Sequence, residues 1–110
     1  MSGYFKKITN ESKRNNELIK LLSRSIFWDI NIDKLDYKKN KQIIIERIAV
    51  HGSENDEKIM NMMYPIKIIK RCLINSDSLN ENTLQYYAFV LKVKESKFKC
   101  YTRIPVQMSF

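Results

Sequence analysis

Glycine and proline are scarce in this chain, with two of each among 110 residues. Chains that stay disordered or consist mostly of loops are rich in both, so a single folded domain over residues 1–110 is predicted. The apolar runs are much shorter than the ~20 residues of a membrane-spanning helix. The first ten residues lack the apolar stretch of a signal peptide, so a cytoplasmic protein without a membrane partner is expected.

Residues that commonly hold metals or perform catalysis are also few. Cys72 and Cys100 are the only cysteines, and they are expected as reduced thiols because their spacing suits neither a zinc site nor a disulfide scaffold. His51 is the only histidine, and beside Gly52, a predicted helix stop, it suits a helix C-terminus better than catalysis. A Gly-rich phosphate loop is absent as well. We therefore expect no enzyme and no cofactor.

The aspartates of the segment before residue 37 are the remaining candidates for a cation site. Asp29, Asp33 and Asp36 lie close in sequence, but the segment lacks the glycine and the terminal glutamate of a calcium loop. Helix capping explains Asp36 better, so no metal is expected.

Positive charge is in excess, with 20 Lys and Arg against 12 Asp and Glu and a net charge of +8. Residues 1–26 carry +4 and residues 78–110 carry +3, whereas residues 27–52 and 53–77 carry +1 and 0. Such an excess attracts nucleic acid, an acidic protein or an anionic surface, although solvated lysines that only aid solubility give the same composition.

Hydrophobic residues recur with helical spacing in five segments, namely 12–26, 37–51, a segment after Ser53 that ends at residue 63, 65–75 and 81–93. Asp36 and Asn80 stand where N-caps are expected, Ser53 and Asp56 have the spacing of a capping box, and Pro65 suits a first helical position. These patterns predict an all-α fold, a compact bundle of about five short helices.

Two of the predicted helices, 37–51 and 81–93, are apolar nearly all round and are expected to pack centrally, with the other three around them. The helix over 12–26 is amphipathic instead. Its apolar face consists of Leu18, Leu21, Leu22 and Ile26, and its basic face of Lys13, Lys20 and Arg24.

The last segment, 98–110, follows a different pattern from the helical core of about 12–97. Its even positions are mostly apolar and its odd positions mostly polar, which predicts an extended, strand-like tail. A single strand forms no sheet, so the tail frays, lies along its own helices, or completes a sheet in another chain. Pairing of two tails would give a homodimer.

The stretch from Phe27 to Gly52 contains a distinctive pattern: Phe27-Trp28-Asp29, then Leu35-Asp36-Tyr37, then Ile44-Ile45-Glu46-Arg47, then Gly52. It resembles a small family of uncharacterised bacterial proteins, a domain of unknown function, over about residues 26–101. The chain departs from that family between Met60 and Pro65. Members are often encoded beside nucleotidyltransferase-type toxins, so the resemblance implies an antitoxin-like role and no catalytic residues. Phe27 and Trp28 are expected as core anchors, and Glu46 and Arg47 as an ion pair with neighbouring helices.

The most consistent interpretation is a non-enzymatic protein-interaction module, antitoxin-like, that binds a partner protein and neutralises or positions it. The residues predicted to contact the partner are Lys13, Lys20, Arg24, Phe98, Cys100, Arg103, Ile104, Val106, Met108 and Phe110.

The alternative is a nucleic-acid-binding regulator that uses basic helix faces, either that of the first helix or Lys67, Lys70 and Arg71. The helix over 81–93 is poorly suited to base recognition because its polar stripe is narrow and includes Glu81.

Overall fold

A computed structural model describes residues 2–103, and within them the side chains of residues 11–101. In this part the chain forms helices and no strands. The α-helices are α1 (Ser2–Ile19), α2 (Lys41–His51), α3 (Glu54–Met63), α4 (Ile66–Ile74) and α5 (Glu81–Leu91). Short 3-10 helices are η1 (Arg24–Phe27), η2 (Ile32–Lys34), η3 (Glu95–Lys97) and η4 (Lys99–Arg103). The predicted all-α fold with five helices is confirmed.

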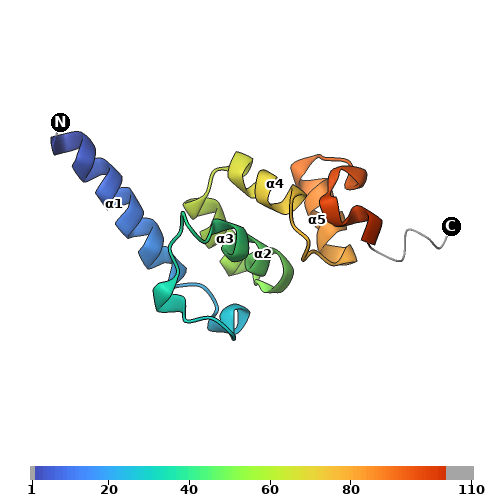
Figure 1. Cartoon of the computed structure of the whole chain (residues 1–110), viewed down its shortest axis with the longest axis horizontal. Coiled ribbons are helices and arrows are strands. Elements are labelled where there is room, and N and C mark those ends of the chain that lie inside the picture. The colour runs from blue at the N-terminus through green and yellow to red at the C-terminus, as the bar shows by residue number, and fades with distance from the viewer. Residues whose placement is uncertain (1, 104–110) are drawn as a thin grey trace.

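Helices α2, α3 and α4 form the middle of the molecule, with α1 projecting from one end and α5 lying at the other (Figure 1). Helix α2 contacts α3, α4 and η1, and α1 contacts α3. One cluster of buried side chains extends from Ile19 to Cys100 and includes the fully buried Ile44, Ile45 and Leu73. No helix among residues 2–103 is long and apolar enough to cross a membrane.

Three of the helix ends that the sequence predicts from short-range signals are present. Ser53 and Asp56 form a capping box at the start of α3, and the Asn80 side chain accepts a hydrogen bond from the Thr83 amide at the start of α5 (2.8 Å). Gly52 follows α2, and a Cβ atom there would lie 2.5 Å from the carbonyl oxygen of Ile48. This close approach, rather than backbone conformation, requires glycine at position 52.

The first predicted helix, 12–26, is wrong at both ends. Helix α1 begins at Ser2 and ends at Ile19, and the chain turns before η1. Leu22 is buried, but Leu21 is 65% exposed, so the predicted apolar face is split. The turn is fixed from outside this segment, because the amide of Ser23 donates a hydrogen bond to Oδ1 of Asp56 in α3 (2.9 Å).

The second predicted helix starts later than expected, at Lys41 instead of residue 37. Asp36 caps a separate turn before it, where its Oδ2 accepts hydrogen bonds from the amides of Lys38 and Lys39 (both 3.0 Å). These bonds hold the pKa of Asp36 below its ordinary value, even though partial desolvation raises it. The Tyr37 side chain is buried next to this turn. Asp36 and Tyr37 thus stabilise the fold.

Pro65, predicted as the first residue of a helix, lies just before it. Helix α4 begins one residue later, at Ile66, so Pro65 is its N-cap residue.

The prediction that the helix over 81–93 lies centrally is wrong. Helix α5 lies at one end of the molecule (Figure 1), and only one of its faces is buried. Leu84 and Tyr87 are on that face, whereas Phe89 is 84% exposed. The helix ends at Leu91, and Lys92 adopts the left-handed conformation of a C-cap (φ 57°).

The first part of the predicted tail is helical rather than extended, since Lys99–Arg103 form η4. Phe98 and Cys100 are 2% and 1% exposed, so the packed core continues past residue 97. Phe98 lies in the link between η3 and η4, and Cys100 lies in η4. Residues 104–110 lie outside the described residues, and an extended conformation there stays a prediction.

Candidate functional site

Trp28 is 66% exposed, which overturns its expected role as a core anchor. Phe27, immediately before it at the end of η1, is buried as predicted. Successive side chains of a 3-10 helix point about 120° apart, so burial of Phe27 turns Trp28 outward. An indole at the surface is unusual because it leaves a large apolar area in water.

Arg47 of α2 holds this part of the chain in place. Its guanidinium donates two hydrogen bonds to the carboxylate of Asp29 (2.7 and 2.9 Å) and one to the carbonyl oxygen of Ile26 (3.0 Å). The same group lies 4.5 Å from the ring centre of Trp28, within the range of a cation–π contact. Arg47 thus forms an ion pair, as predicted, but its partner lies in the turn after η1 and not on a neighbouring helix. Glu46 instead accepts a hydrogen bond from Gln42 on its own helix (3.0 Å).

The ion pair keeps both of its members charged. Hydrogen bonds from Arg47 hold the pKa of Asp29 below its ordinary value, and Asp29 in turn raises the pKa of Arg47. A guanidinium that is bonded on two sides has little freedom to rotate. It therefore gives the Trp28 ring a rigid support.

His51 completes the surface from one turn further along α2. Its exposed ring meets that of Trp28 edge to face, with the ring centres 5.4 Å apart and an interplanar angle of 86°. As predicted, His51 is the last residue of its helix. We call Trp28, Asp29, Arg47 and His51 the Trp28 cluster.

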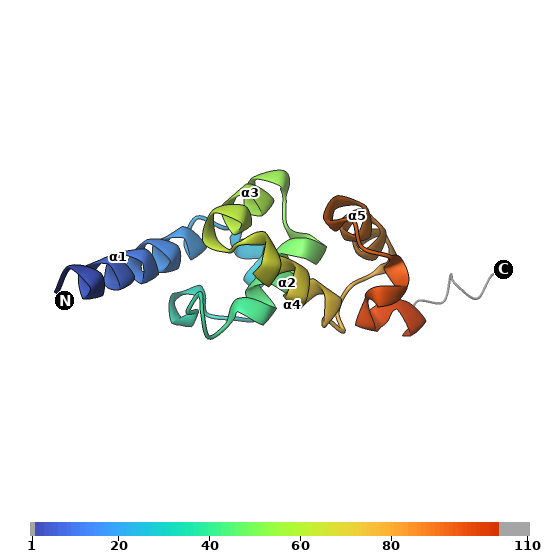
Figure 2. The same cartoon turned by 90° about the horizontal axis from the view of Figure 1, so that it is seen from above.

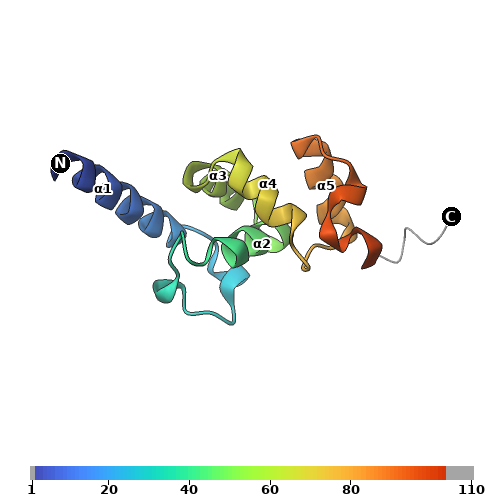
Figure 3. The same ribbon diagram turned by 45° about the horizontal axis from the view of Figure 1, so that its top comes forward.

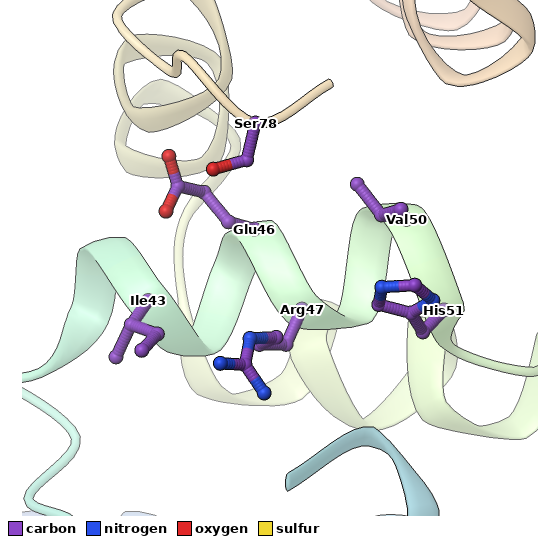
Figure 4. A pocket seen from close by; sticks show the side chains of 6 residues that line it. All are labelled: Ile43, Glu46, Arg47, Val50, His51 and Ser78. Carbon is purple, nitrogen blue, oxygen red and sulfur yellow. The ribbon is translucent and has the colours of Figure 1, made fainter. Parts of the chain in front are cut away.

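A shallow hollow of about 160 Å³ lies next to the Trp28 cluster along α2. Its lining residues are Ile43, Glu46, Arg47, Val50, His51 and Ser78. Figure 4 shows Glu46 pointing toward Ser78, which belongs to the segment between α4 and α5, with Arg47 and His51 further round the same helix. In the part of the chain that the structure describes, no three His, Cys, Asp or Glu residues gather as metal ligands. The Trp28 cluster and the hollow together present two aromatic rings and several hydrogen-bonding groups.

The residues predicted to contact a partner are dispersed. Lys13, Lys20 and Arg24 are exposed, but they lie on α1, on the turn after it and on η1 rather than on one helix. Phe98 and Cys100 are wrong as contact residues because both are buried in the core of their own chain. The side chain of Arg103, together with Ile104, Val106, Met108 and Phe110, lies outside the described residues.

The Trp28 cluster was missed because Trp28 was assigned to the core by residue type alone. A usable signal exists on α2, where positions 43, 46, 47, 50 and 51 recur with helical spacing and share one side. Three of them are Glu46, Arg47 and His51, a polar composition that predicts a solvent-facing surface.

Comparison with known proteins finds one family model that matches the part of the chain carrying this surface. Residues 22–73 match the sequence model of a family of unknown function (DUF6922), and this segment contains the whole Trp28 cluster but not Ser78. No curated protein and no solved structure matches the chain. Residues 22–73 are thus similar to this family of unknown function.

Proposed function

We propose that this chain is a non-enzymatic protein-interaction module, and that the Trp28 cluster is its binding surface. The exposed Trp28 ring, held by Arg47, is the observation that carries the proposal. Tryptophan and arginine are enriched among the residues that dominate binding energy in protein interfaces. A ring that is already fixed loses little conformational entropy when a partner covers it.

The size of the neighbouring hollow favours a protein over a small molecule. Its volume of about 160 Å³ is below the roughly 300–1,000 Å³ of typical small-molecule pockets. A shallow hollow beside an exposed aromatic ring suits one inserted side chain of a partner. Arg24, exposed on the 3-10 helix that leads to Trp28, adds positive charge to the same segment of the chain.

The partner we propose is a nucleotidyltransferase-type toxin, which this chain would neutralise or position as an antitoxin-like protein. The basis for this identity is the resemblance of the Phe27–Gly52 pattern to bacterial proteins encoded beside such toxins. The net charge of +8 favours an acidic docking face on the partner. We place this interaction in the cytoplasm, where two buried cysteines stay reduced.

The test is a pull-down of the product of the neighbouring gene, which we expect to be a nucleotidyltransferase. Trp28→Ala should weaken capture by about 30-fold or more, corresponding to about 2 kcal/mol for a central interface residue. Phe89→Ala is the matched control, since it removes another exposed aromatic ring from α5. Equal capture by Trp28→Ala and the wild-type chain, with both folded by circular dichroism, would refute the proposed surface.

A further inference from the structure

The exposed side of α4 is strongly basic. Lys67, Lys70 and Arg71 are exposed there, and α4 contains no acidic residue. In the described part of the chain these three side chains make no ion pair, since the salt bridges join Arg47 to Asp29 and Lys99 to Asp77. Three uncompensated cations on one helix face attract an anion.

This face is also hollowed and open. The three cations line a wide depression of about 330 Å³ together with Ile74 and Asn75. Figures 2 and 3 show α4 with no other element in front of it. A large, extended ligand can therefore reach the whole face.

Two further lysines extend the positive charge beyond the start of α4. Lys38 and Lys41 are exposed and line a neighbouring hollow of about 320 Å³ with Pro65 and Ile68. One carboxylate, that of Glu11, lines the same hollow. Among the described residues, no acidic side chain lines the depression at Lys67, Lys70 and Arg71.

We propose that the α4 face, formed by Lys67, Lys70 and Arg71, binds the phosphate backbone of duplex DNA. Phosphates spaced along a duplex match a row of cations along a helix. An α-helix with its side chains is about 10–12 Å in diameter, which fits the roughly 12 Å width of the DNA major groove. It follows α3 after only Tyr64 and Pro65, and second helices of such pairs commonly dock on DNA.

Other nucleic acids fit this face less well. Single-stranded chains are bound largely through stacking of bases on exposed aromatic rings, and α4 has no aromatic residue. The major groove of duplex RNA is too narrow for a helix. The amide side chain beside the cations, that of Asn75, already donates to the carbonyl oxygen of Arg71 (3.0 Å), so this face offers mainly positive charge for phosphate contacts. Binding should therefore be independent of DNA sequence.

The experiment measures binding of the full-length chain to a fluorescein-labelled DNA duplex of about 20 base pairs by anisotropy at several salt concentrations. With three to five phosphate contacts, affinity should fall by about 40-fold to 500-fold between 50 and 200 mM salt. The triple variant Lys67→Gln, Lys70→Gln, Arg71→Gln should reduce the slope of log affinity against log salt by about 3.

The matched control is Lys13→Gln, Lys20→Gln, Arg24→Gln, which removes the same number of lysines and arginines from exposed positions elsewhere. It should keep the salt slope within about 1 of the wild-type value. An equal loss in both triple variants would overturn the proposal, because net charge alone would then explain binding. So would the absence of binding at 50 mM salt, or equal affinity for duplex RNA or for vesicles containing phosphatidylserine. Trp28→Ala should bind DNA normally, which separates this proposal from the proposed protein-interaction surface.

Discussion

At the scale of single residues, Asp56 joins three segments of the chain. Its carboxylate accepts hydrogen bonds from the amides of Ser23 and Ser53 (both 2.9 Å), and its own amide donates to the hydroxyl of Ser53. Burial raises the pKa of Asp56, but these hydrogen bonds outweigh that effect and leave the pKa below its ordinary value of 3.8. The charged form is therefore the form that the folded state prefers.

Replacing Asp56 with asparagine should lower the free energy of unfolding by roughly 2 kcal/mol at neutral pH, since an amide NH2 would face a backbone N–H. A carboxylate with a depressed folded-state pKa stabilises the protein above its unfolded-state pKa, near 4, and this stabilisation is lost as pH falls through the folded-state value. The difference between wild type and Asp56→Asn should therefore shrink below about pH 4. Urea unfolding of both proteins at a series of pH values measures this difference in the free energy of unfolding.

The control for this series is Asp33→Asn, at an exposed carboxylate in η2. It should lie within about 0.5 kcal/mol of wild type. A gap between wild type and Asp56→Asn that stays constant down to the acid transition would contradict the assigned role of the carboxylate.

At the scale of elements, α5 is attached through one face and through two tyrosine hydroxyls. Tyr86 and Tyr87 both donate to the carboxylate of Glu57 in α3 (3.0 and 3.1 Å). Tyr87 is buried, and burial together with Glu57 raises the pKa of its hydroxyl well above the ordinary range. Both tyrosines therefore stay protonated as hydrogen-bond donors.

The two faces of α5 should respond very differently to truncation. Tyr87→Ala should lower the free energy of unfolding by about 3 kcal/mol, because it removes a buried ring and a hydrogen bond to Glu57. Phe89→Ala should change it by no more than about 0.5 kcal/mol, because that ring is exposed. Thermal unfolding of the two variants, monitored by circular dichroism, measures both changes. Similar losses for both variants would mean that α5 is packed on all sides.

Elements whose ends depend on nearby residues were predictable from the sequence. The capping box of Ser53 and Asp56, the Asn80 cap and the stop at Gly52 each involve partners within four residues. The end of α1 was not predictable in this way. It depends on a hydrogen bond between Ser23 and Asp56, which are 33 residues apart.

The candidate site was predictable only in part, for the same reason. An ion pair for Arg47 was expected, but its partner Asp29 lies 18 residues away on an irregular segment. Trp28 was misassigned because hydrophobicity alone does not say which of two adjacent aromatic residues faces the core. The packing of Phe27 decides that question, and packing is a property of the folded chain.

At the scale of the whole molecule, the core extends beyond the family segment. The match ends at residue 73, yet Leu84, Phe98 and Cys100 belong to the same buried cluster as Ile44. The residues after α4 therefore contribute to the same core as the family segment.

This continuity predicts that the molecule unfolds as one unit. Cys72 lies in α4 and Cys100 in η4, and both are buried. Their thiols should become accessible to a labelling reagent over the same range of denaturant, coincident with the loss of helical circular dichroism. Mass spectrometry of peptides locates each label. Labelling of Cys100 at clearly lower denaturant would show instead that the C-terminal helices open separately.

The position of Trp28 also has an optical consequence. It is the only tryptophan of the chain, so all tryptophan fluorescence of the protein comes from the candidate binding surface. The emission of an indole depends on the polarity around it, and covering this water-exposed ring should shift the spectrum toward shorter wavelength. A ligand that binds only the α4 face should leave the spectrum unchanged. The tryptophan fluorescence of the unlabelled protein therefore reports whether a candidate partner binds at the Trp28 cluster or elsewhere.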